Sequence, residues 1–138
     1  MTIARLQRNI IWVCLCAACG GPLKYQVPSN ASAPGADASI EALVNEDQNQ
    51  TQLDVEITNL PPPDRVEASS QHYVAWYRRD SNVTWTRVAA LAYEPDSREA
   101  KLVGSVPEKR FELTITAEPD AAAVSPSPSV VFAQAIGD

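Results

Sequence analysis

The chain has 138 residues, with 11 Lys and Arg against 17 Asp and Glu, and a formal net charge of −6. This length allows one ordinary domain with a tail, and not two full domains. The negative charge argues against a nucleic-acid partner, because phosphate recognition needs a basic surface. With one His and no Cys after residue 19, most metal and thiol chemistry is excluded from the body of the chain.

Residues 1–18 have the pattern of a secretory signal segment. Arg5 and Arg8 make its start positive, and it contains no acidic residue. An uncharged apolar run follows over residues 10–18, which is too short for a transmembrane helix of about 20 residues. The run ends in two alanines directly before Cys19. This pattern predicts export of the rest of the chain.

The residues Cys16-Ala17-Ala18-Cys19 resemble the lipobox of bacterial lipoproteins, which usually reads Leu, a small residue, Ala or Gly, and then Cys. Cys16 departs from the usual first residue. The resemblance implies cleavage before Cys19, diacylglycerol on its thiol, and a further acyl chain such as palmitate on its new amine. Because each buried CH₂ gains about 0.8 kcal/mol, two or more chains would anchor the protein firmly. In enterobacterial lipoproteins a residue other than Asp after this Cys implies transfer to the outer membrane, and Gly20 follows here.

Two alternatives to the lipobox stay open. The segment is also compatible with an ordinary secretory signal that is cut near Gly20 and Gly21. The spacing of Cys14, Cys16 and Cys19 is compatible with a metal or redox cluster, although no His lies nearby.

Residues 19–38 are predicted to be a flexible tether after the lipidated Cys19. Residues 20–38 contain three Pro and three Gly, with many Ser and Ala. A coil of about 18 residues has a root-mean-square span of roughly 20–25 Å. We therefore expect a domain that stays near the membrane and tumbles independently.

From residue 39 onward, apolar residues alternate with polar ones, which is typical of half-buried strands. A short helix from Asp37 is the alternative for the first segment, because Ala, Glu and Leu favour helix. Residues 71–93 are predicted to form a hairpin of two long strands. The predicted strands cover residues 39–44, 53–57, 71–79, 83–93, 98–104, 111–117 and 130–136.

The spacing of these strands predicts an all-β domain over residues 39–138. About seven short strands, separated by turn signals, favour a single antiparallel β-sandwich of the immunoglobulin or fibronectin type. Nearly 100 ordered residues suffice to bury roughly two thirds of the unfolded surface.

Chemistry-bearing residues are sparse. His72 is the only imidazole, and no nucleophile motif accompanies it. The acidic residues are scattered over several turns and show no calcium-loop spacing. We therefore predict no catalytic residue, no metal site and no cofactor, and we expect that the protein is not an enzyme.

Aromatic residues of the hairpin 71–93 are the candidate ligand-binding residues. By alternation, Trp76 lies on one face of its strand, while Tyr73 and Tyr77 share the other face. We expect Tyr73 and Tyr77 to form a surface pair that, with Trp85, could bind a glycan or a peptide. The alternative is that these aromatics pack in the core.

The second half of the chain resembles the extracytoplasmic β-sandwich of anti-sigma-K-like bacterial factors. The resemblance covers about residues 71–133 and rests on short motifs: Tyr73-Val74-Ala75-Trp76, Ala89-Ala90-Leu91, Ile115-Thr116-Ala117-Glu118-Pro119, and the Ser-Pro stretch over residues 125–131. It implies a β-sandwich placed outside the cytoplasm. The sigma-binding helical region and the transmembrane helix of that family have no counterpart in the sequence, so regulation of a sigma factor is not implied.

Together these patterns predict a lipid-anchored, extracytoplasmic β-sandwich that acts as a structural or protein-interaction module of the bacterial cell envelope. Its partners would be a membrane, through the lipid on Cys19, and an envelope protein. The alternative function is a ligand-binding lipoprotein that uses the aromatic hairpin 71–93.

Overall fold

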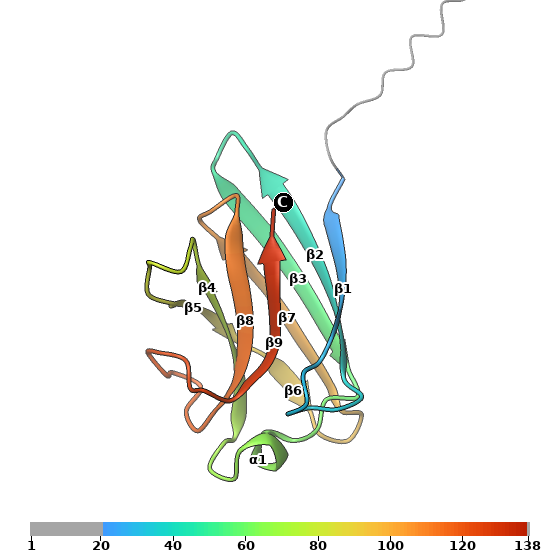
Figure 1. Cartoon of the computed structure of the whole chain (residues 1–138). Coiled ribbons are helices and arrows are strands. Elements are labelled where there is room, and N and C mark those ends of the chain that lie inside the picture. The colour runs from blue at the N-terminus through green and yellow to red at the C-terminus, as the bar shows by residue number, and fades with distance from the viewer. Residues whose placement is uncertain (1–20, 138) are drawn as a thin grey trace, which may run out of the picture.

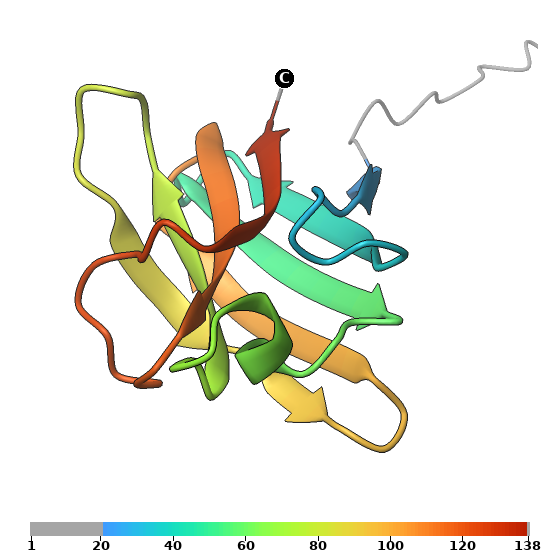
Figure 2. The same ribbon diagram turned by 60° about the horizontal axis from the view of Figure 1, so that its bottom comes forward.

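The computed structural model describes residues 21–137, which form two stacked antiparallel β-sheets and one helical turn (Figure 1). Sheet A has the strand order β1-β2-β3-β7-β6, and sheet B has the order β5-β4-β8-β9. Sheet A contains β1 (Leu23–Pro28), β2 (Asp37–Asn45), β3 (Gln50–Thr58), β6 (Ala92–Glu94) and β7 (Glu99–Val106). Sheet B contains β4 (His72–Arg78), β5 (Thr86–Ala90), β8 (Phe111–Glu118) and β9 (Val130–Ile136). The helical turn α1 (Pro63–Val66) lies at one end of the sandwich (Figure 2).

The predicted all-β sandwich is confirmed, with nine strands in the described part of the chain rather than about seven. Apart from β1, the strands β2-β3-β7-β6 face β5-β4-β8-β9. This is the strand order of immunoglobulin-type sandwiches, with an added edge strand in each sheet. β2 occupies Asp37–Asn45, so the predicted strand is correct there and the alternative helix is not.

The main core lies between the inner faces of the two sheets. In β3, Leu53, Val55 and Ile57 are buried while the residues between them are exposed. This alternation is expected where one face of a sheet is covered and the other meets water. From the opposite side, β8 contributes Leu113 and Ile115. The core is therefore mainly aliphatic.

The structure corrects the predicted tether over residues 19–38. Leu23–Pro28 forms β1, which pairs antiparallel with β2 along its whole length. Ala33 and Ala36, in the turn that follows, are buried. Of the prolines and glycines that suggested a coil, those that the structure describes lie at the ends of β1 or in this turn, where an edge strand tolerates them. The first described strand therefore begins at Leu23.

The predicted strand over residues 83–93 is wrong as a single element. Its first part, β5, pairs with β4 in sheet B, and its last part, β6, pairs with β7 in sheet A. Between them, the buried Leu91 donates its N–H to the carbonyl oxygen of Tyr73 at 2.9 Å. Residues 88–92 are all apolar, so their pattern contains no period that could mark the change of sheet.

The middle of the outer face of sheet B is also buried, beside the connection between β8 and β9, residues 119–129, which we call the cover loop. Trp76 is 0% exposed, although its side chain points away from sheet A. Its indole Nε1–H donates to Thr116 Oγ1 at 2.8 Å, and Thr116 Oγ1 donates to Glu118 Oε2. Glu118 Oε2 also accepts the backbone N–H of Ser127, at 2.8 Å. This polar chain ties the cover loop to β4 and β8.

Two further contacts hold the cover loop near its two ends. Arg87 of β5 donates from Nε and Nη2 to the carbonyl oxygen of Ala121, at 3.0 and 2.7 Å. Ser127 Oγ donates to the carbonyl oxygen of Ala117 at 2.8 Å. The middle of the loop lies between these anchors, beside the connection from β4 to β5.

Candidate ligand-binding groove

A shallow groove of about 590 Å³ opens between the connection from β4 to β5 and the middle of the cover loop. Both walls are loops that flank the outer face of sheet B. The β4–β5 side contributes Arg78, Ser81, Asn82, Val83, Thr84 and Trp85, and the cover loop contributes Val124 and Ser125.

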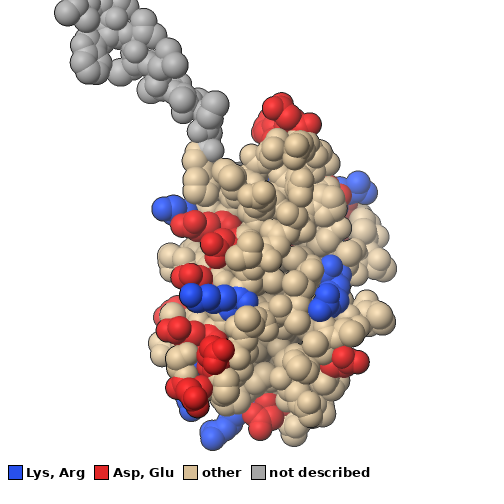
Figure 3. All heavy atoms as spheres, turned by 180° about the vertical axis from the view of Figure 1, so that it is seen from behind, with Lys and Arg blue, Asp and Glu red and all other residues tan. Residues whose placement is uncertain are grey.

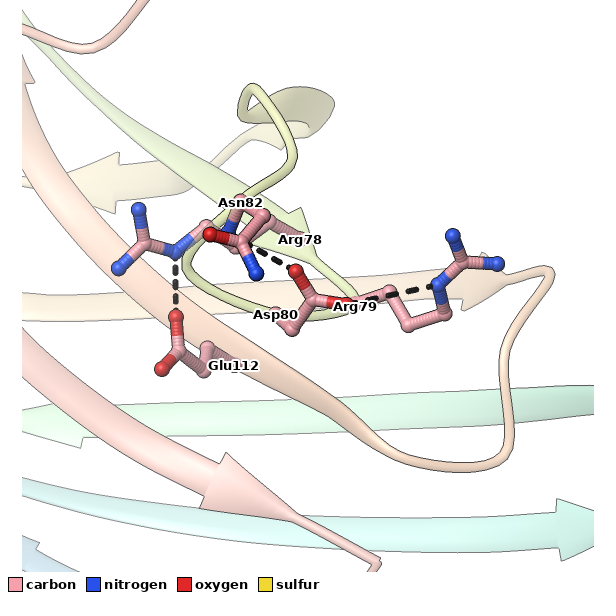
Figure 4. A network of polar contacts seen from close by, with 5 residues as sticks. All are labelled: Arg78, Arg79, Asp80, Asn82 and Glu112. Atoms are coloured by element: carbon pink, nitrogen blue, oxygen red, sulfur yellow. Dashed lines mark hydrogen bonds and ion pairs between the residues drawn. The ribbon is translucent and has the colours of Figure 1, made fainter.

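The β4–β5 wall is shaped by a turn stabilised by its own side chains. Asp80 Oδ1 accepts the backbone N–H of Asn82 at 2.8 Å, which closes a local turn typical of Asp. Asp80 Oδ2 also lies 3.8 Å from Arg79 Nε. Figure 4 shows the neighbouring side chains Arg78 and Arg79 pointing in opposite directions, as expected at the end of a strand. Arg78 is therefore directed to the outer face of sheet B.

Arg78 is held from two sides. Its Nε donates to Glu112 Oε2 on the neighbouring strand β8 (Figure 4). Its guanidinium carbon lies 4.3 Å from the centre of the Trp85 ring, within the range of a cation–π interaction. The groove therefore combines an aromatic ring and a cation that are already oriented against each other.

Apolar side chains at the groove reach into solvent. Val124 is 91% exposed at the middle of the cover loop, and Val83 is also exposed. Exposed apolar side chains next to a concave surface with a few polar groups are typical of binding sites.

The structure does not bring the three predicted ligand-binding residues together. Tyr73 is 0% exposed and packs in the main core, so the expectation that Tyr73 and Tyr77 form a surface pair is wrong. Tyr77 is partly buried and packs edge-on against Phe111, with ring centres 6.1 Å apart. Only Trp85 lines the groove. Tyr73 and Tyr77 share a face, as alternation predicts, but that face is the inner one.

Tyr73 has a structural environment that explains its burial. Its hydroxyl donates to the carbonyl oxygen of Pro61, while the hydroxyl of Tyr93 donates to the carbonyl oxygen of Leu60 at 2.7 Å. Burial raises the pKa of Tyr73, and the nearby Tyr93 and Asp64 raise it further. Burial also raises the pKa of Tyr93, although Arg98 opposes that shift. The two tyrosines fix the chain that follows β3.

Of the eight groove residues, the sequence predicts only Trp85; Arg78 and Val124 are the two unpredicted residues that matter most for binding. The position of Arg78 could have indicated its role, because it lies at the end of a predicted strand, seven residues before Trp85, with a turn between them. The signal for Val124 is a single large aliphatic residue in a stretch of small residues and prolines. Neither signal shows by itself that the two residues meet.

The remaining site predictions concern metal and lipid. Within residues 21–137, no group of three or more His, Cys, Asp or Glu side chains is placed to hold a metal ion. In the same range, no helix is long and apolar enough to cross a membrane. Cys19, the predicted lipidation site, lies outside the described residues.

The fold and the groove define an immunoglobulin-like β-sandwich with a solvent-facing groove beside the outer face of one sheet. No protein-family model matches the chain, and no curated protein or solved structure is significantly similar to it. The resemblance of residues 71–133 to anti-sigma-K-like factors therefore stays a prediction. The function has to be argued from the residues themselves.

Proposed function

We propose that this chain is a bacterial lipoprotein, anchored through Cys19, whose β-sandwich acts outside the cytoplasm as a structural or protein-interaction module of the cell envelope. The observation that carries the proposal is the position of Cys19. It follows an uncharged apolar run after two arginines, and three residues separate it from the first strand at Leu23.

The proposed processing is compatible with the fold. Cleavage before Cys19 removes residues 1–18, and the nine strands and α1 all lie beyond that point. The main core and the cover loop are likewise built from residues after the cleavage site. A lipid anchor therefore leaves the described domain whole. Gly20 after Cys19, in place of Asp, supports placement in the outer membrane rather than the inner membrane.

Metabolic labelling with an acyl-chain probe tests the anchor. We expect the wild-type chain to be labelled, and Cys19→Ala to lose the label and accumulate with its signal segment uncut. Cys14→Ala is the matched control, because it changes a cysteine of the same segment outside the lipobox and should keep the label. Unlabelled wild type, or equal labelling of Cys19→Ala, contradicts the proposal. Separation of inner and outer membranes then tests the location.

A ligand-binding function is the second candidate, and the groove favours it. Trp85 supplies an aromatic surface, Arg78 supplies a cation, and Val124 supplies exposed apolar area. Aromatic rings bind both sugars and peptide side chains, and a guanidinium group binds carboxylates. A glycan or a peptide with an acidic group fits this combination.

Screening of glycan and peptide arrays with the purified protein tests this second function. We expect hits that are lost in Trp85→Ala and weakened in Val124→Ser. Val103→Ser is the matched control. Val103 is also a highly exposed valine, at 80%, but it lies on the outer face of sheet A, away from the groove. Hits that all three variants retain would exclude the groove as the binding site. Circular dichroism must show that each variant is folded.

A further inference from the structure

The short stretch between Cys19 and the first strand constrains where the domain can lie. This inference depends on the lipid anchor proposed above. Only Gly20, Gly21 and Pro22 separate Cys19 from Leu23, where β1 begins. A chain extends by at most about 3.3–3.6 Å per residue, so Leu23 lies within about 14 Å of the lipidated residue. A domain held this closely does not tumble independently of the membrane.

The end of the sandwich at which β1 begins, which we call the proximal pole, carries a wide hollow of about 1120 Å³. In Figure 1, the start of β1 lies at the same end as the β2–β3 turn and the end of β9. The apolar side chains that line the hollow are Leu23, Leu43 and Val44, of which Leu43 is 46% exposed. Exposed apolar residues beside a lipid anchor are suited to the interface between headgroups and acyl chains.

The hollow also contains cations that can bind phosphate. Arg79, Lys109 and Arg110 line it, together with the acids Glu46, Asp47 and Glu108. The turn that carries Lys109 is tightly packed, because Gly137 has a φ of 93° and any side chain there would lie 2.2 Å from the Lys109 carbonyl oxygen. The hollow is therefore lined by three cations and three acids, and Arg79 also lies 3.8 Å from a further acid, Asp80.

The opposite end, the distal pole, bears α1 and is strongly acidic. Its exposed acids are Asp37, Asp64, Glu67, Glu94, Asp96, Glu99 and Asp120, and its cations are Arg65 and Arg98. An anionic membrane surface repels this end more strongly than the proximal pole. Figure 3 shows acidic and basic side chains interspersed on the opposite side of the molecule from Figure 1, with no continuous basic strip for lying flat.

We infer that the proximal pole rests on the headgroup layer of a phospholipid bilayer when Cys19 carries its lipid. Leu43 enters the interface, the cations of the hollow contact lipid phosphates, and the distal pole points away. β3 runs from pole to pole with nine residues, which at about 3.3 Å per residue places the distal pole roughly 30 Å from the bilayer. This orientation leaves the groove on the flank of the sandwich open to partners.

Site-specific fluorescence quenching in vesicles tests the orientation. The lipidated full-length protein is reconstituted into vesicles that contain anionic phospholipid and a lipid with a quencher at its headgroup. After processing, Cys19 is acylated and no other cysteine remains, so single cysteines can be labelled specifically. The three variants are Leu43→Cys at the proximal pole, Val103→Cys on the flank and Asp96→Cys at the distal pole.

We expect strong quenching at Leu43→Cys, weaker quenching at Val103→Cys and none above background at Asp96→Cys. Equal quenching at all three positions, in protein that floats with the vesicles and carries acyl chains by mass spectrometry, overturns the orientation but not the lipoprotein function. Protein that lacks acyl chains and does not float overturns both. The two failures are therefore distinguishable.

Charge reversal tests which groups hold the proximal pole. In the Leu43→Cys background, Lys109→Glu with Arg110→Glu should reduce the quenching in anionic vesicles, and high salt should reduce it in the parent protein. Arg65→Glu with Arg98→Glu, which adds the same charge at the distal pole, is the matched control and should preserve it. Equal loss in both double variants excludes a specific role for the proximal cations.

Discussion

The inner face of sheet B and the middle of its outer face are both buried, but by different kinds of contact. On the inner face, Leu113 and Ile115 pack against sheet A without directional bonds. On the outer face, Trp76, Thr116 and Glu118 are covered by a loop and joined by hydrogen bonds. A buried polar group is costly unless each hydrogen-bonding atom finds a partner.

The two faces should therefore tolerate different substitutions. The inner face should depend mainly on side-chain volume, because apolar packing has no direction. The outer face should depend on whether each donor and acceptor keeps its partner, because a single loss leaves another buried group unpaired.

The largest effect is expected for Trp76→Ala on the outer face. The free energy of unfolding should fall by about 3–5 kcal/mol, because the change removes a large buried side chain and the donor to Thr116 Oγ1. Urea denaturation of the purified protein measures the loss. Trp76→Phe is the matched variant, because it keeps a six-membered aromatic ring while it removes the indole donor and part of the ring volume, and it should cost clearly less. A loss below about 1 kcal/mol for Trp76→Ala would mean that the cover loop does not bury this face.

A smaller effect is expected for Glu118→Ala. Removal of the carboxyl group leaves the Ser127 N–H and the Thr116 hydroxyl without their acceptor, so the free energy of unfolding should fall by about 2 kcal/mol. Glu118→Gln retains one oxygen that can accept both bonds and should be less harmful. Denaturation curves compare the two variants. Equal stability of Glu118→Ala and wild type would show that the polar chain contributes nothing to holding the loop.

On the inner face, the buried hydroxyl of Tyr73 allows the effect of a polar group to be tested. Burial raises its pKa, so the unfolded chain ionises first as pH rises above about 10, the ordinary value for Tyr. The unfolded state then binds fewer protons than the folded state, and the free energy of unfolding falls as pH rises.

Tyr73→Phe should reduce this alkaline loss of stability and cost about 1 kcal/mol at neutral pH, because the carbonyl of Pro61 loses its donor. Denaturation at pH values on both sides of about 10 measures both effects. Tyr93, whose pKa burial also raises, should account for part of the remaining slope. An unchanged slope in Tyr73→Phe would mean that its hydroxyl reaches solvent.

The elements that the sequence predicts best are those in which apolar and polar residues alternate. Residues 111–117 alternate cleanly, and the structure places β8 over Phe111–Glu118. β3 is predicted for the same reason. Alternation shows which residues share a face, but it cannot show what covers that face. Alternation therefore predicts correctly that Tyr73 and Tyr77 share a face. The expectation that this face is the exposed one is wrong.

Other features depend on contacts between distant segments. β1 is not predicted from the sequence, because Pro and Gly at its ends suggest a coil. Only its pairing with β2 makes Leu23–Pro28 a strand. Trp85 and Val124 line the same groove from two distant loops, and local patterns contain no information about how those loops come together. Of the three predicted binding residues, Trp85 alone is at the groove, because it lies in a turn rather than inside a strand.

The smallest effect on overall stability is expected for Arg87→Ala, which loosens the cover loop near its first end. Arg87 is exposed, so the free energy of unfolding should fall by less than about 1 kcal/mol. Loss of its bonds to the Ala121 carbonyl should nevertheless speed amide hydrogen exchange at Ala122 and Ala123, while Ser127 stays protected by Glu118.

Hydrogen exchange followed by NMR distinguishes local from cooperative opening of the cover loop. Arg79→Ala is the matched control, because the Arg79 side chain pairs only with the adjacent Asp80 and should leave the loop amides unchanged. If Ser127 loses protection together with Ala122 in Arg87→Ala, the loop opens as one unit. The cover loop would then open locally and expose the outer face of sheet B. The inner face would be exposed only by global unfolding.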